Sequence, residues 1–157
     1  GQVRSKSLDI GSVRLTEMFI SSHPISWAEL INMEQYIQKT LKENKDELPE
    51  PNSSRRVVAV AGTPTTLAMI DQGIFFKEEQ VHQFELSVDK MNHWIRKLAK
   101  MSIIERQELI GMHPKRADVI VTGAMILKSV SEFLGHNKIW VSTKGVRYGA
   151  ALLMDSF

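Results

Sequence analysis

The sequence predicts an α/β fold in which a mixed sheet is flanked by helices. Two short apolar runs, Val57–Ala61 and Ile139–Ser142, contain the β-branched residues typical of strands, and a turn with glycine follows each run. Segments with apolar residues at helical spacing separate the two runs. Strands joined through helices pair in parallel by a right-handed crossover, so we expect both runs to end at the same edge of the sheet.

The first third of the chain is predicted to contain a strand, a helix and a loop. Residues 3–10 carry apolar side chains near every second position, as a strand does. Ser22 is predicted to cap a helix with Pro24 at its first position. Residues 48–54 are rich in Pro, Asn and Ser and indicate a loop. The apolar face of the helix is predicted to consist of Trp27, Leu30, Ile31, Ile37 and Leu41.

In the middle of the chain, Val57–Ala61 is apolar without alternation, which is typical of a central strand covered on both faces. A short helix is expected from Thr66 to Gln72, because Gly73 is a usual helix end. Residues 75–84 are predicted to be irregular.

The second half is predicted to be mainly helical. Ser87 caps a helix that extends to about Met101, and Ser102 with Glu105 forms a capping box for a further short helix. Val119–Val121 alone fits a strand, but a long helix ending at Gly135 is favoured. Its apolar face would consist of Ile120, Ala124, Leu127, Val130 and Leu134. The last strand is expected over residues 138–142, and a final helix over Tyr148–Met154.

Length and composition indicate one globular domain over residues 1–157, with 43% hydrophobic and 24% charged residues. The chain contains no cysteine, which excludes disulfides, thiolate catalysis and Cys-ligated zinc and fits a cytoplasmic location. A net charge of +2 is too small to indicate nucleic-acid binding. No apolar run approaches a bilayer span, so no membrane partner is expected.

Three turns centred on Gly11, Gly62 and Gly145 are rich in Ser and Thr. Glycine lets backbone N–H groups approach a ligand closely, and a strand that leads through such a turn into a helix favours phosphate binding. Each turn alone would more simply reverse the chain. Because two of the turns follow the expected parallel strands, residues 62–66 and 144–147 are predicted to face one cleft.

Four segments together resemble the exopolyphosphatase / guanosine pentaphosphate phosphohydrolase (Ppx/GppA) family. The resemblance covers nearly the whole chain, which is similar to the second, C-terminal lobe of such an enzyme. It implies the ribonuclease H-like fold of actin-like ATPases. The segments that carry it are residues 7–17, 61–68, 113–120 and 145–149.

This resemblance implies a magnesium-dependent hydrolase that releases terminal phosphate from inorganic polyphosphate, or the 5′ γ-phosphate from guanosine pentaphosphate. In that family, water attacks the terminal phosphorus of a substrate held between two lobes, and the resemblance implies the same here. The catalytic carboxylates and the magnesium ligands would belong to an N-terminal part that is missing here. The chain starts with Gly1 rather than Met, so we expect a fragment that lacks the first hairpin of its sheet. Such a fragment is expected to be inactive alone and to form a homodimer, to swap a strand, or to retain the missing piece non-covalently.

The resemblance also suggests phosphate-binding residues. The Gly62 and Thr63 amides would hold phosphate together with the Thr65 or Thr66 hydroxyl, although one Thr is expected to cap the following helix.

Arg116 is the first choice for a charged phosphate contact, with a surface pair to Asp118 as the alternative. Gly145 and Arg147 would approach from the last turn, and Arg147 could instead brace the final helix. Arg14 is interpreted as structural, paired with a carboxylate such as Glu17.

Two other functions remain open at this point. The chain could be the nucleotide-binding lobe of a sugar kinase-like or chaperone-like ATPase, with the Gly62 turn meeting adenosine. It could also be a non-catalytic sensor of guanosine tetraphosphate or pentaphosphate. The five histidines show no metal-ligand spacing.

Overall fold

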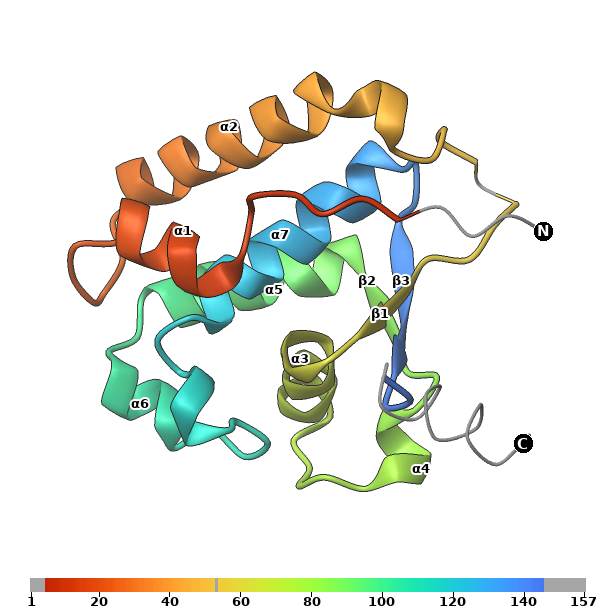
Figure 1. The fold of residues 1–157 in the computed structure, drawn as a ribbon. Helices are drawn as coiled ribbons and strands as arrows, with labels where there is room; N and C mark the ends of the chain where they lie inside the picture. Colours follow the sequence, from red (N-terminus) through yellow and green to blue (C-terminus); the bar gives the residue numbers. More distant parts are fainter. Residues whose placement is uncertain (1–4, 53, 146–157) are drawn as a thin grey trace, which may run out of the picture.

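A small mixed sheet flanked by helices organises the structure, a computed structural model that describes residues 5–52 and 54–145 (Figure 1). The expected α/β class is confirmed. The α-helices are α1 (Ser12–Phe19), α2 (Trp27–Glu43), α3 (Gly62–Gln72), α4 (Glu78–Val81), α5 (Val88–Ala99), α6 (Ile103–Gln107) and α7 (Ile120–Phe133). The 3-10 helices are η1 (Lys45–Glu47) and η2 (Pro114–Arg116), and the strands are β1 (Val58–Val60), β2 (Glu85–Ser87) and β3 (Lys138–Ser142).

The strands are arranged in the order β1-β3-β2. As predicted, β1 and β3 pair in parallel, with Val60 opposite Ser142, so both strands end at the same edge. Strand β2 pairs antiparallel to β3, with Leu86 opposite Ile139. The sequence analysis does not anticipate β2, because three residues carry too little pattern and their partner lies about fifty residues away.

Helix α7 lies at the centre of the helical layer, where it contacts α1, α2, α3 and α5 (Figure 1). Its first residues, including Ile120, Val121 and Ala124, are almost fully buried. It ends at Phe133, and Gly135 follows with a φ of 75°. The predicted long helix and its glycine stop are therefore confirmed.

Two of the predicted helix starts are confirmed by their hydrogen bonds. The Ser87 hydroxyl accepts from the Lys90 amide at the start of α5. Ser102 and Glu105 form the expected capping box of α6, with the Ser102 amide donating to the Glu105 carboxylate at 2.7 Å. These bonds satisfy amides that have no acceptor within the helix.

The predicted start of α2 is wrong. Its cap is Ser26, which forms a capping box with Glu29, whereas Ser22 and Pro24 lie before the helix and the His23–Pro24 peptide bond is cis. Hydrogen bonds from Ser21 and Ser26 to the Glu29 carboxylate lower its pKa to about 2. The capping-box spacing of Ser26 and Glu29 is present in the sequence. It determines the helix start in preference to Ser22 and Pro24, because Ser26 and Glu29 form two reciprocal hydrogen bonds between side chain and backbone.

The N-terminal segment also differs from the prediction. Residues 5–10 form no strand, and no strand of the described residues pairs with them. A strand needs hydrogen bonds to a neighbouring strand, and residues 5–10 have no such neighbour among the described residues. The side chain of Ile10 nevertheless packs into the hydrophobic core. Helix α1 follows directly after Gly11 and was not predicted. Arg14 forms its ion pair with Asp9 rather than with Glu17.

One face of the sheet is open within the described residues. Helix α3 packs against all three strands, and Ala59 is buried on that side. On the opposite face Val58 is 55% exposed and Val60 is 44% exposed. The expectation of a strand covered on both faces is therefore wrong within the described residues, because Val58 and Val60 remain largely exposed.

The predicted helix over Tyr148–Met154 falls outside the described residues. In the part of the chain that the structure describes, no helix has the length and apolarity that a membrane crossing requires.

Candidate functional site

The turn after β1 leads into α3 without a gap. The helix begins at Gly62, four residues earlier than predicted, and its N-cap residue Ala61 makes no side-chain capping bond. The expectation that a threonine caps this helix is thus wrong. The Gly62 and Thr63 amides have no acceptor inside the helix, and Pro64 has no N–H group. This helix start therefore presents two free donors and the positive end of the helix dipole.

Ala61 holds an unusual backbone conformation, with φ 78° and ψ −168°. This region is almost restricted to glycine, and other residues in it store about 1–3 kcal/mol of strain. This conformation turns the chain directly from β1 into α3. The Gly62 amide therefore lies just beyond the carboxyl end of the strand.

Replacing Ala61 by glycine is expected to stabilise the chain by about 1 kcal/mol, since the relieved strain exceeds the added entropy of the unfolded chain. Urea unfolding followed by circular dichroism measures this change. The matched control is Ala28→Gly in the first turn of α2, which is exposed and helical and should lose stability instead. Equal losses in both variants would show that Ala61 is not strained.

The Arg116 guanidinium lies directly against Gly62. A Cβ atom placed on Gly62 would overlap the Cζ, Nη2 and Nε atoms of Arg116, so only glycine permits this approach. Arg116 forms no salt bridge with a carboxylate of the described residues, and the alternative pair with Asp118 is not observed. The planar guanidinium of Arg116 thus lies beside the free amides at the start of α3.

A hollow of about 310 Å³ brings these groups together with the start of α1. The N-cap residue of α1 is Gly11, which has no side chain to cap the helix, and Ser12 at the helix start lines the hollow. Two uncapped helix starts and one guanidinium therefore face a single space, while none of its described lining residues is acidic. The remaining lining residues are Ile10, Val60, Ala61, Gly62, Thr63, Pro64, Arg116, Gly123, Ile126 and Leu127.

Thr63 lines this hollow and also packs against the central helix α7. A Cβ atom on Gly123 of α7 would lie 2.6 Å from Thr63 Cγ2 and 2.7 Å from its Oγ1, so the two helices touch at a glycine. The close contact with α7 fixes the side chain of Thr63 and the first turn of α3. The sequence analysis does not identify Gly123, because a glycine inside an apolar helix carries no local signal of its contact.

The structure separates the other predicted residues from this hollow. The Thr65 hydroxyl donates to the carbonyls of Ala61 and Gly62, each at 3.1 Å, and Thr66 is only 1% exposed. Gly145 follows the same sheet edge but does not line the hollow, and Arg147 falls outside the described residues. Of the predicted set, the structure thus brings Gly62, Thr63 and Arg116 together.

The turn that carries Gly145 is tied to α4. The Thr143 hydroxyl donates to Glu78 Oε1 at 3.2 Å, and the Thr143 amide donates to His82 Nδ1 at 3.3 Å. A hydrogen bond and the charge of Lys144, together with the Thr143 bond, lower the pKa of Glu78. These contacts hold the carboxyl end of β3 against α4.

Arg106 is a buried charge that the sequence analysis misses. Although it lies on the short helix α6, it is fully buried, and its guanidinium donates to the carbonyls of Leu98 and Ala117. Burial lowers its pKa to about 10, and the charge of Asp118 opposes this shift. Burial and then the charge of Arg106 lower the pKa of His23. No pattern in the sequence distinguishes this arginine from an exposed one.

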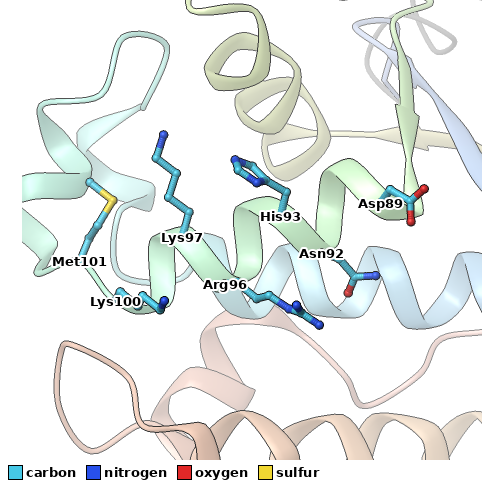
Figure 2. Close-up of a pocket in the computed structure, with 7 residues that line it drawn as sticks. All are labelled: Asp89, Asn92, His93, Arg96, Lys97, Lys100 and Met101. Atoms are coloured by element: carbon cyan, nitrogen blue, oxygen red, sulfur yellow. The ribbon is translucent and has the colours of Figure 1, made fainter.

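A larger hollow of about 850 Å³ lies along α5 (Figure 2). Figure 2 shows that its side chains extend from one helix in different directions: His93 and Lys97 on one side, Arg96 and Asn92 on the other. No two of them converge on a common point, so the hollow at the start of α3 is the better candidate for a binding site.

The chain resembles known phosphatases in sequence and in structure. It is 33% identical over 150 residues to the bifunctional 3-dehydroquinate synthase/phosphatase of Fusobacterium nucleatum. The aligned region covers 93% of this chain and 22% of that protein. It is 30% identical over 155 residues to exopolyphosphatase 2 of Mycobacterium tuberculosis, covering 96% of this chain and 48% of that protein. The chain thus spans less than half the length of these relatives.

A crystal structure of the Aquifex aeolicus Ppx/GppA phosphatase matches the fold with a TM-score of 0.88 and 26% identity, over 97% of this chain and 50% of the other. The Ppx/GppA phosphatase family profile matches residues 2–155, which is nearly the whole sequence. The predicted resemblance to this family is therefore confirmed, and the chain belongs to the Ppx/GppA phosphatase family.

Proposed function

We propose that this chain is the phosphate-binding second lobe of a two-lobed phosphohydrolase. The complete enzyme would release terminal phosphate from inorganic polyphosphate or the 5′ γ-phosphate of guanosine pentaphosphate. The observation that carries the proposal is the hollow at the start of α3, where the Arg116 guanidinium lies over the free amide end of the helix. The named exopolyphosphatase among the relatives supports the choice of substrate.

The hollow is suited to hold a phosphate group and to neutralise its charge. The Gly62 and Thr63 amides would donate to two phosphate oxygens, and Arg116 would donate from the side. The Ser12 hydroxyl is a further donor at the start of α1. Since the described lining contains no carboxylate, the group that positions the attacking water would come from the other lobe.

The same reasoning applies to magnesium. Within residues 5–52 and 54–145, no group of three or more His, Asp or Glu side chains is placed to hold a metal ion. These residues do not fit a metal site, so we propose that the other lobe supplies the magnesium ligands. No catalytic step is assigned to the metal in this chain.

A titration of the chain with tripolyphosphate, followed by amide NMR, tests the binding site. We expect the Gly62 and Thr63 amide signals to shift, and sodium chloride at matched ionic strength to leave them in place. The Arg116→Gln variant should lose most of the response. Shifts confined to Arg96–Lys100 on α5, or no shifts, would contradict the proposal.

The activity itself requires the complete two-lobed protein. Joined to the lobe that the relatives carry in addition, the chain is expected to release phosphate from polyphosphate in the presence of magnesium, and alone to release none. Release from ATP but not from polyphosphate would instead favour a kinase-like ATPase. Binding of guanosine pentaphosphate without hydrolysis would favour a sensor.

A cytoplasmic location and a homodimer belong to the same proposal. The absence of cysteine fits a reducing compartment, and the open face around Val58 and Val60 supports self-association of the isolated chain. A solution mass of one chain at high concentration would remove the dimer from the proposal.

A further inference from the structure

Arg106 is the one charged side chain among the described residues that is fully buried. Its Nε atom donates to the Leu98 carbonyl at 2.8 Å, and its Nη1 atom donates to the Ala117 carbonyl at 2.9 Å. The Nη2 atom is buried and has no hydrogen-bond partner. A buried cation without a paired carboxylate is costly, so an apolar residue would serve packing alone better than this arginine does.

The two carbonyls connect separate parts of the fold. Leu98 lies in the last turn of α5, which packs on the central helix α7. Ala117 is fully buried and directly follows Arg116, at the end of the turn formed by η2. The guanidinium of Arg106 therefore ties the turn that carries Arg116 to a core helix.

Other bonds within this turn are local. The Arg116 amide donates to the His113 carbonyl at 2.8 Å, and the Ala117 amide donates to the Pro114 carbonyl at 3.3 Å. Such bonds shape the turn but do not fix its place relative to the surrounding helices. Two bonds enter the turn from α6: Gln107 Nε2 donates to the Pro114 carbonyl at 3.3 Å from an exposed position, and Arg106 donates to the Ala117 carbonyl. Only the second comes from a fully buried side chain, which at the same time bonds the Leu98 carbonyl of α5.

We infer that Arg106 is a positioning residue: by holding the Ala117 carbonyl to α5, it sets the Arg116 guanidinium over Gly62. The inference rests on the proposed phosphate site for its functional meaning, although the positioning itself is a property of the chain without ligand. Arginine suits the task because its planar fork directs two donors to two acceptors at fixed angles, which lysine cannot do.

The first test needs no ligand. The charged guanidinium beside Gly62 affects the amide signal of that residue, so displacement of Arg116 has a spectroscopic signature. In Arg106→Lys and Arg106→Met, the Gly62 signal is expected to move toward its position in Arg116→Gln. Leu41→Ala on α2, 2% exposed in the wild type, is the control for lost stability and should leave the Gly62 signal in place.

The lysine variant keeps a basic group with N–H donors but lacks the planar fork that reaches both carbonyls, so it is the deciding variant if the methionine variant does not fold. An unchanged Gly62 signal in folded Arg106→Lys would overturn the inference. Failure of wild-type chain to bind tripolyphosphate would contradict the proposed function, but the Gly62 signal would still decide whether Arg106 positions Arg116.

A double-mutant cycle supplies the second test. Calorimetric titration with tripolyphosphate is expected to show about tenfold weaker binding for Arg106→Lys and for Arg116→Gln, as for loss of one charge-assisted hydrogen bond. If Arg106 acts through Arg116, the double variant should bind no more weakly than Arg116→Gln alone. Losses that multiply to about a hundredfold would show that the two residues act independently, against the inference.

Discussion

Replacing Arg116 with glutamine is expected to lower kcat/KM for phosphate release by the two-lobed protein by about 100-fold, as is usual when one donor to a developing oxyanion is lost. The guanidinium lies over Gly62 without a carboxylate partner among the described residues, so its donors are free for phosphate oxygens. Glutamine retains a short polar group but neither the charge nor the reach of the fork.

Phosphate release over a range of polyphosphate concentrations measures this effect. Arg116→Lys should recover part of the loss, because a point charge remains but the paired donors do not. The matched control is Arg96→Gln, the same change at an exposed residue of α5 (Figure 2), which should keep wild-type kcat/KM. Equal values for Arg116→Gln and Arg96→Gln would remove Arg116 from the site.

The largest loss of stability is expected at Gly111. This residue has a φ of 90°, and a Cβ atom on it would lie 2.7 Å from the backbone carbon of Met69 and 2.8 Å from the Ile74 carbonyl oxygen. Alanine would suffer both the strain of the left-handed region and overlap with backbone that cannot rotate away. Together these effects are expected to cost about 3–4 kcal/mol.

Gly73→Ala separates the two contributions. Gly73 has a φ of 64°, but nothing lies within 4 Å of a Cβ atom placed there. Its replacement should cost only about 1–2 kcal/mol, the price of the conformation alone. Urea unfolding of both variants measures the difference, and equal losses would show that the contact between Gly111 and α3 can relax.

The parts of the fold that follow from local rules could be predicted from the sequence. Ser87 and the Ser102–Glu105 pair cap their helices as expected, because the bonding partners lie within three residues. The positive φ of Gly73 and Gly135 likewise ends a helix at each predicted stop. The parallel pairing of β1 and β3 follows from the crossover rule.

The errors concern features that local sequence rules do not determine. Residues 5–10 carry a strand pattern, but a pattern cannot provide the neighbouring strand. The early start of α3 depends on the strained backbone of Ala61, a conformation that the residue type argues against. For this reason the sequence predicts Thr65 in the turn and Thr66 at the helix start, whereas the structure places both residues inside α3.

The contact of Thr63 with Gly123 has a consequence for the thermodynamics of binding. The first turn of α3 is held against the central helix before any anion arrives, so its amides are preorganised. If phosphate binds here as proposed, little backbone entropy would be lost when it displaces water, and more of the gross interaction energy would remain as affinity. A site on a free loop with the same donors would bind more weakly, although its list of contacts would be identical.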